Sequence, residues 1–314
     1  MSEINFHDAQ QALGFLQPQL QRIETEVYQT RFPSFDYSRL MFVNTDGGMW
    51  DAGSVFYSGS IAGAAQFLSG KGVDMPFAEV AQSQHLRTNH FAGIGYEWSL
   101  QELQRAAALG RNLGSEKALA ASKVAEAFLY GIAMRGSDEK GITGLINDAQ
   151  VPAALVAADG TGSARDWASK DADKVARDVN AVLNAPATET KETHRANTLL
   201  LPTSRLQAIA GKRIGDGTDS VLKFIKENNA YTLETGQPLT IIGSRELETA
   251  GADSAARMIA YDNSREVMQF HLPGPHEFLP AFQKSPMLWE VAGIMNVGGV
   301  EIRLPKAVAY RDGL

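Results

Sequence analysis

The sequence predicts an α+β fold that combines a β-rich excursion, one long helix and a unit in which strands and helices alternate. Glycine-punctuated, β-favouring runs fill residues 46–98, and a helical apolar periodicity runs through residues 99–135. Short apolar runs then alternate with helical patterns between residues 145 and 261. The 314 residues are 44% apolar and 21% charged, which is the composition of a globular protein with a buried core.

The first 45 residues predict a helix that is followed by a break. One helical face is indicated by apolar residues at three- and four-residue spacing, namely Leu13, Leu16, Leu20, Ile23 and Val27. Pro18 is a candidate interruption, and Pro33 ends any helix that reaches it. We interpret residues 1–45 as an N-terminal arm.

Residues 46–98 predict a long two-stranded excursion with little core of its own. The β-favouring runs Ser54–Ser58 and Phe77–Phe91 flank a polar tip at residues 69–74. An isolated two-stranded ribbon is marginally stable in water, so we expect this one to lie on a neighbouring subunit. The residues that we expect to make this intersubunit contact are Gly70, Lys71, Gly72 and Asp74.

Residues 99–135 predict the clearest helix. Ser99 and Glu102 form a capping box at its start. Gly110 and Gly114 each weaken a helix by about 1 kcal/mol relative to alanine, so we expect a bend or a break near them. A continuous helix of this length would be a rod of roughly 50 Å, long enough to act as a spine.

The second half of the chain predicts a mixed unit that ends in β structure. The expected helices begin near Asp171, at Thr203 and at Thr218 or Asp219, and the expected strands cover residues 197–201, 239–242 and 258–261. The run Val300–Leu304 alternates apolar and polar residues, which predicts another strand. Gly298–Gly299 before it is a candidate two-residue hairpin turn.

Composition excludes several kinds of protein. The chain has no cysteine, so it has no disulfides, thiolate metal sites or cysteine nucleophiles. Its apolar runs are far shorter than the roughly 20 residues that a membrane-spanning helix needs, and no secretory signal is recognisable. The net charge is −7 without Lys/Arg clusters, so we expect only weak, non-specific contact with nucleic acid.

Catalytic and ligand-binding motifs are also missing from the sequence. No phosphate-binding loop, dinucleotide fingerprint or nucleophile elbow is complete. His85 and His90 are five residues apart, which points them to opposite faces of a strand. Glu246 and Glu248 are expected to be solvated charges rather than an acid/base pair. The sequence therefore predicts no catalytic, cofactor-binding or metal-binding residue, and no enzyme.

The order of these parts, together with several local stretches, resembles the major capsid proteins of tailed bacteriophages, whose fold encapsulin shells share. The resembling stretches are residues 23–28 (Ile-Glu-Thr-Glu-Val-Tyr) with Phe32 and Pro33, residues 95–103 (Gly-Tyr-Glu-Trp-Ser-Leu-Gln-Glu-Leu), residues 117–121 (Lys-Ala-Leu-Ala-Ala) and residues 141–147 (Gly-Ile-Thr-Gly-Leu-Ile-Asn). The resemblance spans nearly the whole chain.

The resemblance implies four structural parts. These are an N-arm at 1–45, an extended loop at 46–98, a peripheral domain with a spine helix at 99–144 and 259–314, and an axial domain at 145–258. It implies an icosahedral shell of pentamers and hexamers around a double-stranded DNA genome, located in the virion and assembled in the host bacterial cytoplasm. Portal, scaffolding and decoration proteins are further implied partners. No coiled-coil segment precedes the arm, which suggests a separate scaffolding protein or none.

Two other interpretations stay open at this point. One is an encapsulin-type nanocompartment shell, which predicts the same subunit fold. The other is an unrecognised α/β enzyme, which would need a concave site with convergent polar groups. Some shells of the resembling family join an extended-loop lysine to an asparagine of a neighbour. Lys71 and Asn296 are a conceivable pair for that bond, but we favour a solvated Lys71 at the loop tip.

Overall fold

The computed structural model describes residues 36–62, 77, 79–108, 113–159, 162, 164–215 and 219–314. The chain divides into two units, residues 1–34 and 35–314, and only the second contains described residues. The predicted arm helix and the predicted loop tip therefore lie outside the described residues. Among the described residues, no helix is both long enough and apolar enough to cross a bilayer.

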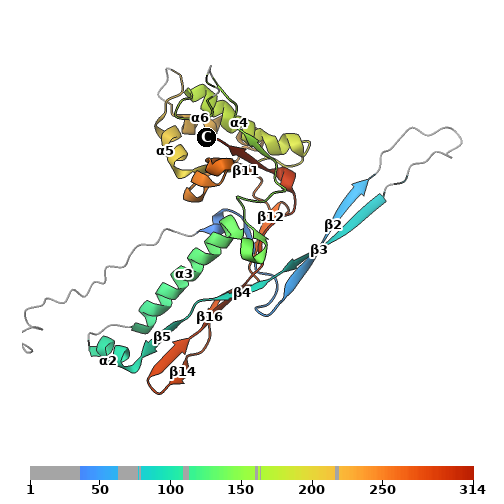
Figure 1. The fold of residues 1–314 in the computed structure, drawn as a ribbon. Helices are drawn as coiled ribbons and strands as arrows, with labels where there is room; N and C mark the ends of the chain where they lie inside the picture. Colours follow the sequence, from blue (N-terminus) through green and yellow to red (C-terminus); the bar gives the residue numbers. More distant parts are fainter. Residues whose placement is uncertain are drawn as a thin grey trace, which may run out of the picture. The chain divides into compact units, whose positions relative to one another are not determined.

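A five-stranded mixed sheet organises the second half of the chain (Figure 1). Its strands, in spatial order, are β10 (Thr240–Ser244), β9 (Thr198–Pro202), β11 (Arg257–Tyr261), β18 (Val308–Asp312) and β8 (Ala153–Leu155). The two outer pairs are parallel and the inner pairs are antiparallel. The helices of this part are α4 (Ala172–Glu189), α5 (Thr203–Gly211), α6 (Val221–Glu227) and α7 (Ala230–Thr235).

Both faces of this sheet are buried at strand β9, which explains its continuous apolar run Leu199–Leu201. Leu199 and Leu201 enter one core with the apolar face of α4, whereas Leu200 enters a second core on the other face. Tyr261 and Tyr310 also belong to the second core, where their hydroxyls donate to backbone carbonyls of other segments. Burial raises the pKa of both phenols, which keeps them protonated as donors.

The predicted helices of this part are present, but the N-terminal capping residue of one of them differs from the prediction. Helix α4 buries Val175, Val179, Val182 and Leu183, which are the residues that its periodicity placed on one face. Helix α6 is capped by Ser220, whose hydroxyl accepts from the backbone of Lys223. The expected cap at Thr218 or Asp219 was therefore wrong by one or two residues.

The described parts of the predicted long helix are α2 (Leu100–Ala108) and α3 (Leu113–Arg135). The capping box is confirmed: the Ser99 backbone N–H donates to Glu102 at 3.0 Å, and the Glu102 N–H donates to the Ser99 hydroxyl at 3.2 Å. Residues 109–112, which include Gly110, lie outside the described residues, so the bend or break expected near Gly110 and Gly114 stays a prediction. Helix α3 packs against β5, β6, β7 and β17.

The remaining strands form narrow sheets. They are β1–β12–β17 (Phe42–Asn44, Met268–His271, Gly299–Ile302), β13–β16–β4 (Gly274–Phe278, Gly293–Val297, His90–Gly93), β14–β15–β5 (Phe282–Ser285, Leu288–Val291, Tyr96–Ser99), β2–β3 (Gly53–Ala62, Glu79–Thr88) and β6–β7 (Gly136–Ser137, Ile142–Thr143). Short 3-10 helices are η1 (Tyr37–Arg39), η2 (Asp138–Lys140), η3 (Arg245–Thr249), η4 (Ala252–Ser254) and η5 (Pro305–Ala307). The predicted two-stranded excursion corresponds to β2 and β3, which pair antiparallel over ten residues each.

The predicted hairpin turn at Gly298–Gly299 was wrong. Strand β17 pairs antiparallel with β12, whereas β16 pairs with β13 and β4. All residues of β17 are buried despite their alternating polarity, because the polar member Glu301 is paired inside the protein with His271. The predicted domain boundary at 258/259 falls within β11, and β18 shares its sheet with β8–β10. The four-part division of the chain stays a prediction.

Candidate functional site

Large apolar side chains remain exposed on three parts of the described chain. We name them the base patch, at the foot of the β2–β3 ribbon, the helix patch, on α3, and the tip patch, on the β14–β15 hairpin. The base patch is Trp50, Val55, Leu86 and Phe91; the helix patch is Leu119, Val124 and Phe128; the tip patch is Leu279, Phe282 and Met287. Contiguous exposed apolar patches of this kind mark protein–protein contacts.

The base patch has the most exposed tryptophan that the structure describes. Trp50 is 75% exposed and lies against Phe91, with 5.6 Å between ring centroids. A second aromatic side chain nearby in sequence, Phe42, is covered by the guanidinium of Arg265 at 5.1 Å. Aromatic pairs held rigidly at the surface offer large contact area at low entropic cost, which favours their use in an interface.

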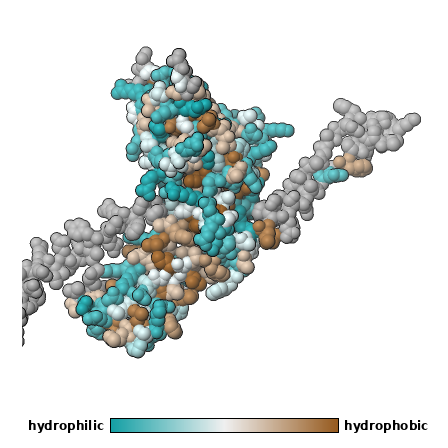
Figure 2. Space-filling model, viewed as in Figure 1, coloured by the Kyte–Doolittle hydropathy of each residue, from teal (hydrophilic) through white to brown (hydrophobic). Residues whose placement is uncertain are grey.

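The helix and tip patches belong to the part of the chain that carries α2, α3 and the β14–β15–β5 sheet. Figure 2 shows hydrophobic residues gathered on the visible face over the region of α3. All four residues of β14 are exposed, and Phe282 is 66% exposed. Val124 and Phe128 are four residues apart, so they lie on one face of α3. Sequence periodicity places both on the apolar face of the helix, and both are exposed within the subunit.

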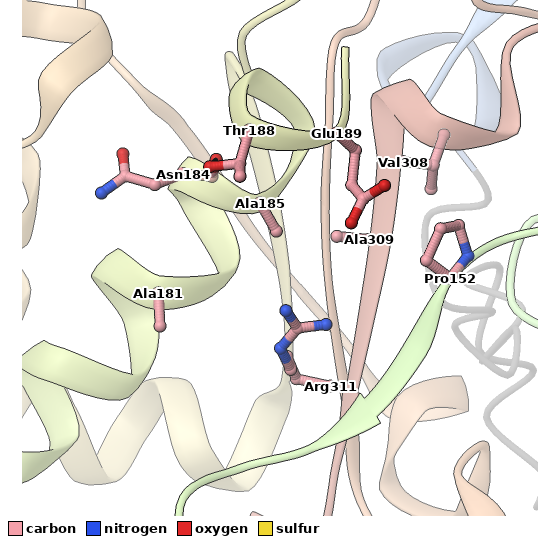
Figure 3. A pocket seen from close by; sticks show the side chains of 9 residues that line it. All are labelled: Pro152, Ala181, Asn184, Ala185, Thr188, Glu189, Val308, Ala309 and Arg311. Carbon is pink, nitrogen blue, oxygen red and sulfur yellow. Dashed lines mark hydrogen bonds between the residues drawn. The ribbon is translucent and has the colours of Figure 1, made fainter. Parts of the chain in front are cut away.

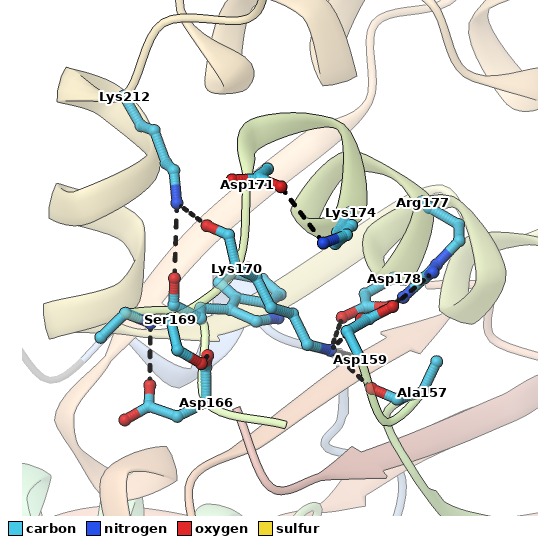
Figure 4. Close-up of polar contacts among 12 residues, drawn as sticks. Ala157, Asp159, Asp166, Ser169, Lys170, Asp171, Lys174, Arg177, Asp178 and Lys212 are labelled. Atoms are coloured by element: carbon cyan, nitrogen blue, oxygen red, sulfur yellow. Dashed lines mark hydrogen bonds and ion pairs between the residues drawn. The ribbon is translucent and has the colours of Figure 1, made fainter. Parts of the chain in front are cut away.

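Charged side chains form their densest buried cluster at the start of α4 (Figure 4). Lys170 and Asp178 are each 3% exposed, and the Lys170 Nζ donates to the Asp178 Oδ2 at 2.5 Å. The same ammonium donates to the Ala157 carbonyl at 2.7 Å and pairs with Asp159 at 3.3 Å. Its three protons therefore all have acceptors, as a buried charge requires.

Arg177 completes this cluster by bridging both carboxylates. Its guanidinium donates to both oxygens of Asp159 and to the Asp178 Oδ1, with distances of 2.7–3.0 Å. These hydrogen bonds from Arg177 are the main cause that lowers the pKa of Asp159 to about 2. Two cations thus balance two carboxylates, and the cluster ties the loop at 157–170 to α4. Both carboxylates are bonded to Lys170 and Arg177.

The hollows of the described chain do not contain a catalytic arrangement. Figure 3 shows one of ≈230 Å³ between α4 and β18. Arg311 and Glu189 are its charged lining residues, beside Asn184, Thr188 and apolar side chains. Burial lowers the pKa of Arg311, and Glu189 raises it. Within the described ranges, no three His, Asp or Glu side chains are grouped to hold a metal ion.

The expected contact residues Gly70, Lys71, Gly72 and Asp74 lie outside the described residues. Asn296, their conceivable cross-linking partner, is 0% exposed in β16, and its amide donates to the Asp51 carbonyl at 2.9 Å. Glu246 and Glu248 are not simply solvated, because Glu246 pairs with Arg135 and Glu248 accepts from Ser204. They serve separate partners, so they do not form an acid/base pair.

A family model described as "Major capsid protein" matches residues 63–314. The chain belongs to this family. It is therefore the subunit of a capsid shell. No curated protein sequence matches the chain significantly.

Solved capsid chains share the fold of this major capsid protein. The capsid of Myoviridae phage XM1 matches with a TM-score of 0.77 at 18% identity, covering 95% of this chain and 98% of that one. The capsid of an empty GTA particle matches with a TM-score of 0.64 at 13% identity, covering 94% and 95%. A virus-like particle from Pyrococcus furiosus matches with a TM-score of 0.51 at 11% identity, covering 88% and 91%. The predicted tailed-phage capsid fold is confirmed.

The family and the fold point to a structural role in the virion capsid. Within the subunit, the Lys170 cluster ties Ala157 and Asp159 to α4.

Proposed function

We propose that this major capsid protein assembles, as pentamers and hexamers, into the closed icosahedral shell of a tailed bacteriophage that encloses double-stranded DNA. The observation that carries the proposal is the exposed apolar surface at the base, helix and tip patches, in a chain of the capsid family. Obligate interfaces of this kind commonly bury more than about 2,000 Å². The ribbon β2–β3 supports the same conclusion, because its extended contacts within the described chain are with itself.

The purified chain is expected to form closed shells without any other phage protein or covalent bond. Electron microscopy should reveal hollow particles, and sedimentation should find little free subunit at micromolar concentration. Dissociation in mild denaturant should release folded subunits, because the two cores lie within one chain. A stable monomer at high concentration would contradict the proposal.

We assign the four predicted parts to roles within this shell. Residues 1–45 are the arm, residues 46–98 the extended loop, residues 99–144 and 259–314 the peripheral domain, and residues 145–258 the axial domain around capsomer centres. Net charge −7 supports weak, non-specific contact with the packaged DNA rather than a basic inner lining. Portal, scaffolding and decoration proteins are proposed partners, and the host bacterial cytoplasm is the proposed place of assembly.

The loop tip is proposed to contact a neighbouring subunit without a covalent bond. Lys71 and Asp74 provide charges for exposed ion pairs, which are usually worth only about 0–1 kcal/mol. Burial of Asn296 under the segment that contains Asp51 supports the absence of a Lys71–Asn296 bond, because a neighbour's lysine has no open path to that amide.

Replacing Lys71 with alanine should therefore weaken particles modestly and abolish nothing. On denaturing gels, subunits from wild-type and Lys71→Ala particles should both migrate as single chains near 33.9 kDa. A ladder of covalent multimers in wild-type particles that disappears in Lys71→Ala would contradict this prediction.

An encapsulin-type nanocompartment is the alternative shell, and particle contents separate it from a phage capsid. Particles from the native source should contain double-stranded DNA if the proposal holds. A packaged enzyme and no genome would favour the nanocompartment. Portal, terminase and tail genes beside the coding gene would favour the phage. Turnover of a substrate by a purified monomer would instead favour an α/β enzyme.

A further inference from the structure

The ribbon β2–β3 has a narrow attachment to the rest of the protein. Its strands pair from Gly53 with Thr88 to Ala62 with Glu79, which gives a length of roughly 30 Å. Among the described elements, β2 and β3 make extended contact only with one another. The direction of the ribbon is therefore decided at its base.

One side chain bridges the base of the ribbon to the body. The Arg87 guanidinium, at the end of β3, donates from a single nitrogen to the Gly298 carbonyl at 2.8 Å and to the Val300 carbonyl at 2.9 Å. Thr88, the last residue of β3, also has a 3.4 Å hydrogen bond to His90 in β4, but His90 is only two residues away in the chain, whereas Arg87 reaches backbone carbonyls more than 200 residues away. Around it lies a hollow of ≈180 Å³ between the ribbon base, the β6–β7 turn and β17.

The acceptors of Arg87 are held in place by their own surroundings. The Gly298 N–H donates to the His271 carbonyl at 2.9 Å. Gly299 has φ +81°, and a Cβ there would lie 2.1 Å from the Ile142 side chain, so this backbone requires glycine. The two carbonyls thus form a fixed cradle for the guanidinium.

The carboxylate of Glu301 lies near Arg87 and favours the charged form of its guanidinium. Burial lowers the pKa of Arg87, and the nearby carboxylate of Glu301 opposes that shift. Glu301 itself accepts from His271 at 2.5 Å and from Arg303 at 3.3 Å. Although burial raises the pKa of Glu301, the hydrogen bond from His271 and the charges of Arg303 and Arg87 together outweigh burial and lower it.

We propose that Arg87 is the positioning residue that sets the angle at which the β2–β3 ribbon leaves the body. The hollow leaves room for other angles, and among the described side chains that line it, Arg87 is the ribbon residue whose hydrogen bonds reach the body on its other side. A swing of about 10° moves the far end of a ribbon of this length by roughly 5 Å. That displacement exceeds the distance at which side chains are in contact, so a swinging ribbon cannot meet each neighbour in one geometry. This inference rests on the proposed shell function.

The ribbon angle can be measured on unassembled subunits. The chain has no cysteine, so spin labels can be attached at Ser60→Cys in β2 and Glu266→Cys in the body. We expect one narrow distance distribution with Arg87 present. In Arg87→Ala we expect a distribution about twofold broader, because a two-stranded ribbon has no other support. Arg87→Lys, which keeps the charge but not the planar fork, should be intermediate.

The matched control is Lys140→Ala, because Lys140 lines the same hollow but pairs with Glu139. This variant should retain the narrow distribution. Circular dichroism must find all variants equally folded, so that broadening reports ribbon angle and not unfolding. A narrow distribution in folded Arg87→Ala would overturn the inference.

Electron microscopy of the label-free chains tests the consequence for assembly. Wild-type and Lys140→Ala shells should have one diameter, whereas Arg87→Ala should give mixed diameters or open sheets. Uniform Arg87→Ala shells would overturn the assembly role of Arg87. If the wild-type chain forms no shells, the proposed function fails, but the distance measurement still decides the role of Arg87.

Discussion

Lys170→Met is expected to lower the free energy of unfolding of the subunit by about 3–5 kcal/mol. The variant removes one cation from a cluster in which Lys170 and Asp178 are almost completely buried. The Asp178 Oδ2 and the Ala157 carbonyl would then lose their donor in a place that water does not reach. Asp178 would keep only its bond from the half-exposed Arg177, and a buried charge that loses its buried partner costs far more than the intact pair stabilises. Urea unfolding of dissociated subunits, followed by circular dichroism, measures the loss.

Lys174→Met is the matched control for this prediction. Lys174 lies on the same helix and pairs with Asp171 at 3.1 Å, but both side chains are largely exposed. Exposed pairs contribute about 0–1 kcal/mol, so this variant should unfold close to the wild type. The double variant Lys170→Met/Asp178→Leu should recover much of the loss, because it leaves no unpaired charge. A Lys170→Met subunit as stable as Lys174→Met would refute the structural role of the cluster.

Acid should weaken the same cluster in a defined range. The pKa of Asp159 is lowered to about 2, chiefly by its hydrogen bonds from Arg177. A carboxylate with a lowered folded pKa stabilises the native state above its unfolded pKa, and that contribution is lost as the pH falls through the folded value. The Asp159 contribution is therefore complete at neutral pH and declines between about pH 4 and pH 2.

The sequence was sufficient to predict those elements whose indicating residues lie close together in the chain. The single apolar stripe of α4 and the capping box of Ser99 and Glu102 depend on residues within one or two turns. The apolar run at 197–201 predicted a short strand, and the observed strand β9 (Thr198–Pro202) is buried along its whole length. The order of such elements, together with the resembling local stretches, implied the capsid fold.

Features that depend on distant residues were missed. Glu301 is the polar member of an alternating strand, but inside the protein its carboxylate is bonded to His271 and Arg303. Arg87 was not singled out from the sequence, because its acceptors are 211 and 213 residues away. No pattern within a short stretch of the sequence predicts the partners of Glu301 or the acceptors of Arg87.

The exposed apolar patches were missed for a different reason. Periodicity assigns apolar residues such as Val124 and Phe128 to the core of the chain itself. In a subunit that assembles, part of the apolar surface is instead covered by other copies. A pattern within one chain does not distinguish the two kinds of burial, and only the exposed fractions of the folded subunit separate them.

Phe282→Ser is expected to prevent shell assembly at concentrations where the wild type assembles completely. Phe282 is 66% exposed in β14, so its removal should leave subunit stability nearly unchanged. Burying a phenylalanine contributes roughly 1.5–3 kcal/mol, which is about a ten- to hundredfold change in one association constant. Because every subunit of a shell makes this contact, the threshold concentration for assembly should rise at least about tenfold. Light scattering across a dilution series measures that threshold.

Gln283→Ser supplies the control on the same strand. Gln283 is exposed like Phe282, but successive side chains of a strand point to opposite faces and its polar group contributes little apolar area. This variant should assemble at the wild-type threshold. Unfolding curves of both variants should overlay that of the wild type, which would separate a lost contact from a damaged fold. Assembly of Phe282→Ser at the wild-type threshold would exclude the tip patch from the interface and leave the base and helix patches as the surfaces that hold the shell together.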